Sequence, residues 1–183
     1  MKTALVTASY AADFELCRLL CETVDAMVTG LTRHYLLVAS HDVAQFRKLE
    51  SPHRVVIDER ELLPAWLKPW RDPFSGFSRY AWLSSRTMPL RGWHVQQLRR
   101  IAVARHLDED AFLYSDSDVV FLKPFDTGSL WRDGALRLYR QDNALPVDGA
   151  YDHATWSLNA GRVLGIADAL EAGLKRLWRR EAA

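Results

Sequence analysis

The sequence predicts an α/β fold, with a mostly parallel central sheet between two layers of helices. Over the first sixty residues, short apolar, β-prone runs alternate with segments of helical periodicity. A further apolar run, AFLYS (residues 111–115), follows a helical segment later in the chain and leads directly to two carboxylates. Strands that alternate with helices in this way are typical of a parallel sheet covered on both faces.

The predicted strands are short runs of apolar residues without helical spacing. Runs of this length between helical segments are typical of strands buried on both faces. They are Thr3–Thr7, His34–Ala39, Arg54–Asp58, Asp110–Ser115 and Ala135–Tyr139.

The predicted helices are recognised by apolar residues at helical spacing. Asp13 is expected to cap the first helix, which Gly30 ends, and a short second helix is expected to start at Ser40 or Asp42 and run through Leu49. Trp93–Leu107 and Leu164–Arg180 show the same periodicity. The predicted inward-facing residues are Phe14, Leu16, Leu19, Leu20, Val24 and Met27 in the first helix, and Val95, Leu98, Ile101, Ala102 and Leu107 in the Trp93–Leu107 helix.

Residues 63–92 follow neither period. They contain four prolines, three tryptophans, two phenylalanines and a tyrosine, which is too aromatic for a disordered linker. A long irregular stretch inside a compact domain is usually functional. Two interpretations remain open: a loop folded over the edge of the core, or one wall of a binding cleft.

Composition restricts the class of protein. With 183 residues and a formal net charge of +1, the chain fits one domain over residues 1–183 and has no bulk charge that would attract nucleic acid. No run approaches the ~20 apolar residues of a membrane span. Cys17 and Cys21, four residues apart on a helix, are expected to be buried reduced thiols, which favours a cytoplasmic protein.

The most informative segment is YSDSDVVFLKPF, where Asp116 and Asp118 follow an apolar strand. Ligands of parallel sheets bind at the carboxyl ends of the strands. Residues i and i+2 of an extended chain point the same way, so both carboxylates would address one point. Their repulsion would be relieved by Mn²⁺ or Mg²⁺ bound together with substrate phosphates. The alternative is that both aspartates are turn or cap residues that bind local backbone amides.

The same residues resemble a known family. The segment DSDVVFLKPF resembles the DxD segment of GT-A glycosyltransferases, and RGWHVQQLRRIAVARHL resembles the GWxxQQ helix of a bacterial branch of that superfamily. The opening VTASYAADFELCRLL is also similar to that branch. The resemblance implies a GT-A (nucleotide-diphospho-sugar transferase-like) fold and a glycosyltransferase. Its donor would be a nucleoside diphosphate sugar, and its acceptor a glycan, lipid or small molecule.

The resemblance also implies roles for individual residues. Thr7, Ser9 and Tyr10 would hold the base and ribose of the donor. The nucleotide-sugar side of the cleft would be lined by Trp93, Gln96 and Gln97. Asp118 would ligate the metal, and Asp116 would contact ribose, the metal or metal-bound water. The alternatives are that Thr7 and Ser9 only end a strand, that Trp93 is a core residue, and that Gln96 and Gln97 are solvated helix surface.

The chain departs from this family after the DxD segment. Fewer than sixty residues follow Phe125, and in such relatives this later part supplies acceptor contacts and any catalytic base. A C-terminal truncation is therefore expected, and the catalytic candidates are Asp148, Asp152 and His153. A non-catalytic nucleotide-sugar or carbohydrate-binding module is the main alternative. An aspartyl-nucleophile phosphatase and a nucleotidyltransferase fit less well, because the DxD lies late in the chain and no glycine-rich phosphate loop occurs.

Overall fold

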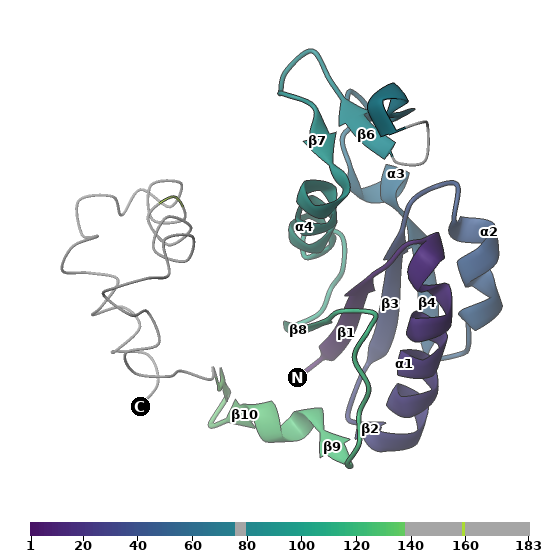
Figure 1. Cartoon of the computed structure of the whole chain (residues 1–183). Helices are drawn as coiled ribbons and strands as arrows, with labels where there is room; N and C mark the ends of the chain where they lie inside the picture. Colours follow the sequence, from purple (N-terminus) through teal and green to yellow (C-terminus); the bar gives the residue numbers. More distant parts are fainter. Residues whose placement is uncertain (76–79, 138–158, 160–183) are drawn as a thin grey trace, which may run out of the picture. The chain divides into compact units, whose positions relative to one another are not determined.

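The computed structural model describes residues 1–75, 80–137 and 159. Its centre is a four-stranded, all-parallel sheet in the order β4-β3-β1-β8 (Figure 1). The strands are β1 (Thr3–Ala8), β3 (Arg33–Val38), β4 (Arg54–Asp58) and β8 (Ala111–Ser115). The predicted mostly parallel α/β sheet is therefore confirmed.

Helices cover both faces of this sheet. One face carries α1 (Phe14–Met27), α2 (Val43–Phe46) and the 3-10 turn Arg47–Leu49, and the other carries α3 (Glu59–Leu62) and α4 (Gly92–Val103). Side chains alternate accordingly, because successive residues of a strand point to opposite faces. In β1, Leu5 packs with Leu20 and Val24 of α1, whereas Val6 packs in the cluster that contains Val103 of α4. Figure 1 shows α1 and α4 on opposite sides of the sheet.

Helix α1 differs from its prediction at its start and on its inward face. Asp13 occupies the N-cap position but makes no side-chain capping bond, because a 3-10 turn (Ala11–Asp13) precedes the helix. The predicted N-cap position is therefore confirmed, but without a capping hydrogen bond from its side chain. Leu16 and Leu19 are exposed. The buried positions are Cys17, Leu20, Cys21 and Val24. Both cysteines are free, as expected.

The proline-rich stretch is folded, contrary to the expectation that residues 63–92 are irregular. It contains β5 (Lys68–Arg71), a 3-10 turn (Pro73–Ser75), β6 (Tyr80–Leu83) and β7 (Leu90–Arg91). The three strands form an antiparallel meander, β5-β6-β7. Its core cluster joins it to the start of α4: Leu63, Leu67, Trp82 and Val95. Strands of two to four residues, one of them containing Pro69, carry too little periodicity to be recognised from sequence.

Helix α4 is shorter than the predicted Trp93–Leu107 helix. Of the predicted inward residues, Val95 is buried, Ala102 and Leu107 pack against the core, and Leu98 is 37% exposed. Its buried residues are Val95, Arg99 and Val103, and Ile101 is 68% exposed. The expected inward position of Ile101 is therefore wrong, because an arginine with a buried partner takes the place of an apolar residue.

Smaller elements complete the described part. Strand β2 (Val28–Thr29) pairs in parallel with β9 (Phe125–Asp126), which a 3-10 turn (Thr127–Leu130) follows. Strands β10 (Trp131–Arg132) and β11 (Ala135–Leu136) form a hairpin. Its two-residue turn, Asp133-Gly134, has positive φ at both positions, as this tight connection requires.

Contacts group the chain into two compact units, Met1–Gly128 and Ser129–Ala183. The first contains the predicted sheet; that the second belongs to the same domain stays a prediction. The expected helix Leu164–Arg180 and the candidates Asp148, Asp152 and His153 lie outside the described residues, as do residues 138–139 of the last expected strand. Among the described residues, no helix is both long and apolar enough to cross a bilayer.

Candidate functional site

The strand order places a topological switch point between β1 and β8. From β1 the chain continues through β3 to β4 on one side, and it returns to the other side of β1 as β8. Thr7 and Ser115 are paired in register, so Ser9 and Asp116 follow neighbouring strand ends. In open α/β sheets, ligands bind in the crevice outside such a switch point.

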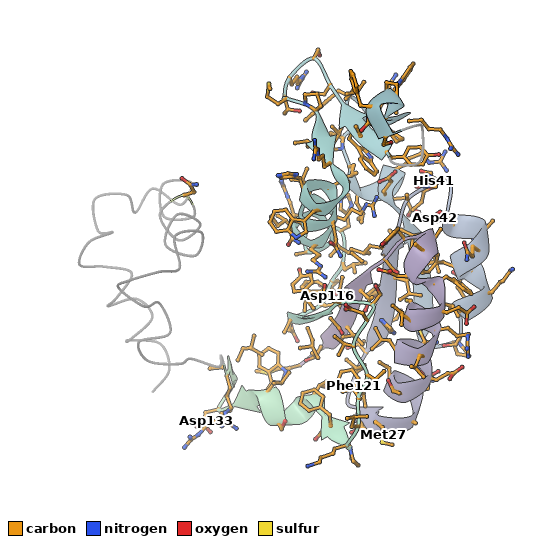
Figure 2. All side chains as sticks on the ribbon, viewed as in Figure 1. Met27, His41, Asp42, Asp116, Phe121 and Asp133 are labelled. Atoms are coloured by element: carbon orange, nitrogen blue, oxygen red, sulfur yellow. The ribbon has the colours of Figure 1, made fainter. Side chains whose placement is uncertain are left out.

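A cleft of about 1880 Å³ lies along this edge. It is lined by the loop after β1, the residues after β3, the meander, one face of α4 and the DSD segment. Figure 2 labels Asp116 after β8, and His41 and Asp42 after β3. The cleft-wall interpretation of residues 63–92 is thereby favoured over a loop that only covers the core.

Both carboxylates of the DSD segment line the cleft, but they have different surroundings. The side chain of Asp116 is 61% exposed and forms an ion pair with Arg100 of α4. Asp118 is exposed and has no ion pair or hydrogen bond within the described part of the chain. Ser117, between them, is buried and donates a hydrogen bond of 3.2 Å to Oδ2 of Asp13.

Asp116 and Asp118 lie after the strand, so the rule that side chains alternate along a strand does not fix their directions. Strand β8 ends at Ser115, and Ser117 and Asp118 are in a turn. Alternation holds only along extended backbone. That Asp116 and Asp118 address one point therefore stays a prediction. Arg100 supplies one cation that offsets the charge of Asp116.

The donor types in the cleft suit a hard divalent cation. Carboxylate oxygens from Asp116 and Asp118, completed by substrate phosphates and water, are the set that Mg²⁺ or Mn²⁺ accepts. No group of three or more histidine, cysteine, aspartate or glutamate side chains that could hold a metal occurs in residues 1–75, 80–137 and 159. A cation bound here would thus depend on oxygen atoms of its substrate.

The loop after β1 contributes Ser9 and Tyr10 to the cleft, but not Thr7. Tyr10 is 55% exposed, whereas Ser9 is buried at the cleft floor. Thr7 is fully buried, and its hydroxyl lies 3.0 Å from Nε2 of His34. The prediction that Thr7 holds the nucleotide is therefore corrected: Thr7 is part of a buried polar network below the site.

That network has a defined proton arrangement. Arg54 Nε donates to Nδ1 of His34 at 3.1 Å, so Nδ1 carries no proton, and Nε2–H donates to Thr7. Arg54 also bonds the carbonyls of Leu49 and Cys21 and the carboxylate of Asp25. Burial, followed by the charge of Arg54, lowers the pKa of His34 to about 3, which keeps the imidazole neutral.

Helix α4 supplies a further part of the cleft lining. Gln96 donates from Nε2 to the carbonyl of Ala8 at 3.2 Å, which ties α4 to the end of β1. Trp93, Gln96 and Gln97 all line the cleft. Trp93 is 59% exposed, so it is not a core residue. The two glutamines are half-buried, not fully solvated surface.

Sequence reasoning missed three features of this site. Arg99 is buried with Glu59 and lies over the ring of Trp82, 5.6 Å from its centroid. Arg100 pairs with Asp116. His41 stacks on Tyr80 of β6 with ring centroids 4.1 Å apart, a contact between the central sheet and the meander. For the two arginines, the sequence did hold one signal: residues 96, 99, 100 and 103 are spaced three or four apart and therefore share one face of a helix.

Comparison with known families places the chain. Residues 2–176 fit a family of unknown function, DUF6492. The chain belongs to this family. No curated protein and no solved structure matches it significantly.

Proposed function

We propose that this DUF6492 protein binds a nucleoside diphosphate sugar together with Mn²⁺ or Mg²⁺ and transfers the sugar to an acceptor. The observation that carries the proposal is the switch point. The loop after β1 and the DSD segment after β8 leave neighbouring strand ends and line one cleft. The resemblance to GT-A glycosyltransferases rests on these two segments together with the GWHVQQ segment of α4.

The cleft residues divide naturally between the parts of such a donor. Tyr10, exposed on the loop after β1, would stack on the base, beside the buried cleft residue Ser9. Trp93 and Gln97 on α4 would line the side that holds the sugar. Gln96 has a second function, because its amide already holds the end of β1.

The carboxylates would hold the metal end of the donor. Asp118 has no competing partner in the described part of the chain, so it is assigned as the direct ligand. Asp116 would contact ribose, the metal or metal-bound water after release from Arg100. When bound, the metal would stabilise negative charge on the leaving diphosphate as a Lewis acid. Arg100, once released, would face the same charge from α4.

The proposal leaves the catalytic base unassigned, since Asp148, Asp152 and His153 lie outside the described residues. Turnover distinguishes the enzyme from its alternative, a non-catalytic module that binds the nucleotide sugar without reaction. Incubation of the protein with UDP-, GDP- and dTDP-sugars and Mn²⁺, followed by detection of free or transferred sugar by mass spectrometry, is the direct test.

Binding should be measured beside turnover. Calorimetric titration with nucleoside diphosphates, with and without Mn²⁺, is expected to give binding that requires the metal for at least one base. Binding with neither hydrolysis nor transfer would support the module. The absence of metal-dependent binding for every base would contradict both.

A further inference from the structure

The meander presents one face away from its core cluster. In antiparallel strands, paired residues lie on the same face. Trp82 pairs with Leu90 and belongs to the core cluster, so its neighbours in β6 point the other way. This opposite face, called here the outer face, consists of Lys68, Trp70, Ala81, Leu83 and Arg91.

The outer face contains a slot one strand wide. Trp70 and Arg91 both pair with Ala81, from opposite sides. Two strand spacings separate their backbones, about 9.5 Å. The small alanine between two long side chains leaves a depression that can receive one flat ring. Trp70 is 61% exposed, and Trp70, Ala81 and Arg91 all line the cleft.

Charge on the outer face is positive and uncompensated. Lys68 and Arg91 have no ion pair or hydrogen bond from their side chains to any described residue, and the face carries no carboxylate. Asp72, next after β5, accepts a hydrogen bond from the amide of Phe74. The other arginines that line the cleft are engaged: Arg71 over the ring of Tyr80, Arg99 with Glu59, and Arg100 with Asp116.

We propose that the outer face is a saccharide subsite of the cleft and that its ligand is an anionic sugar. The ring of that sugar would stack on the indole of Trp70, and its carboxylate or phosphate would bind the guanidinium of Arg91. An indole offers a flat apolar surface to the C–H face of a sugar ring, and a guanidinium binds such anions with paired hydrogen bonds. The description of this subsite as the acceptor side rests on the proposed function; the binding of the sugar does not.

The shape of the site argues against a larger polyanion. The slot has room for one ring beside a single tryptophan, and the whole chain has a net charge of only +1. Nucleic-acid surfaces instead combine an extended positive groove with several stacking platforms. An anionic glycan fits both the width and the charge of the slot.

The test compares matched acidic and neutral sugars, without metal or nucleotide. The probes are sialyllactose against lactose, trigalacturonate against maltotriose, and mannose 6-phosphate against mannose, titrated by calorimetry and tryptophan fluorescence. At least one acidic probe is expected to bind about tenfold or more tightly than its neutral partner. Arg91→Gln and Trp70→Ala should each weaken that binding about tenfold, whereas Arg105→Gln, exposed beyond the other end of α4, should change it less than about twofold.

Three results of the sugar titrations would overturn the assignment. They are equal binding of acidic and neutral partners, binding unaffected by either variant, and no binding of any acidic probe. Displacement of the sugar by equimolar inorganic sulfate would also overturn it, because a simple anion would then suffice. Metal-dependent nucleotide binding is measured in the same preparations. If nucleotide binding is absent and the acidic sugar binds, the proposed donor site is contradicted and the sugar subsite stands. If nucleotide binds and no acidic sugar does, the sugar subsite is contradicted and the donor site stands.

Discussion

Arg100 of α4 forms an ion pair with Asp116, the first residue after β8, and so joins the helix to the DSD segment at the switch point. Its Nε is buried and has no hydrogen-bond partner in the described part of the chain. The pair gives Asp116 a resident cation. A metal would have to compete with Arg100 for this carboxylate, or share it.

Arg100→Gln should therefore strengthen metal binding in the absence of nucleotide. Because Asp116 is 61% exposed, solvent screens the pair, and the gain should be modest. We expect Mn²⁺ to bind about two- to fivefold more tightly, measured by electron paramagnetic resonance of free Mn²⁺. In the same variant, nucleoside diphosphate should bind less tightly at saturating Mn²⁺, because a cation facing the diphosphate is lost. Unchanged affinity for Mn²⁺ and for nucleoside diphosphate would show that Arg100 has only a structural role at the end of β8.

Asp118→Asn should abolish metal-dependent nucleotide binding without unfolding the protein. The side chain is exposed and has no described partner, so the free energy of unfolding should change by about 0.5 kcal/mol or less. Asp108→Asn, at another exposed carboxylate, is the matched control and should bind nucleotide normally. A large fall in the thermal transition of Asp118→Asn would instead indicate a structural role for this carboxylate.

Two tryptophans that line the cleft should differ in how much stability the protein loses when each is replaced by alanine. Trp93 is 59% exposed, so Trp93→Ala should weaken nucleotide-sugar binding and lower stability by about 0.5 kcal/mol or less. Trp82 is 4% exposed in the core cluster of the meander, so Trp82→Ala should cost about 3–5 kcal/mol. Urea unfolding followed by circular dichroism measures both. Similar losses of stability for the two variants would contradict this assignment.

His34 predicts a dependence of stability on pH. Its pKa falls from 6.5 to about 3 on folding, so between these values the unfolded chain binds a proton that the folded chain does not. Stability from this group is therefore complete above pH 6.5 and is lost as the pH falls toward 3. Between about pH 7 and about pH 5.5, the loss should be about 1 kcal/mol in urea unfolding.

Two variants separate the contribution of His34 to the pH dependence of stability from that of the carboxylates. His34→Asn should remove its share of the pH dependence, and His106→Gln, at an exposed position, should keep it. The same slope in the wild type and in His34→Asn would mean that the network around Arg54 accepts a proton in the folded state.

The main strands could be predicted because their signal is local. Arg54–Asp58 was predicted with the bounds that the structure has, and the other three strands of the sheet within two residues at each end. A run of apolar residues can satisfy its backbone and bury its side chains only in a few ways, so composition and length suffice. The meander was not predicted because its strands are only two to four residues long, because β5 contains a proline, and because the meander packs on α4 through contacts that the local sequence does not show.

The candidate site was predictable only in part. Ser9, Tyr10, Trp93, Gln96, Gln97 and both aspartates line the cleft. Thr7, two residues before Ser9, does not, because it lies within β1 and is fully buried in the sheet, where its hydroxyl contacts His34 of β3. Arg99 was not singled out from the sequence, and it is buried because Glu59, forty residues earlier in the chain, pairs with it from α3.

By itself, the sequence determined where the strands of the central sheet lie and that two carboxylates follow a buried strand. The reason is that backbone pairing and side-chain burial of such strands depend on short stretches of residues. Only the tertiary structure decided which polar groups became partners: Arg100 with Asp116, Arg99 with Glu59 and His34 with Arg54. The physical reason is that a charge is stabilised by whatever packs within a few ångströms of it. Residues that lie far apart in the chain reach that distance only once the sheet and its helices are assembled.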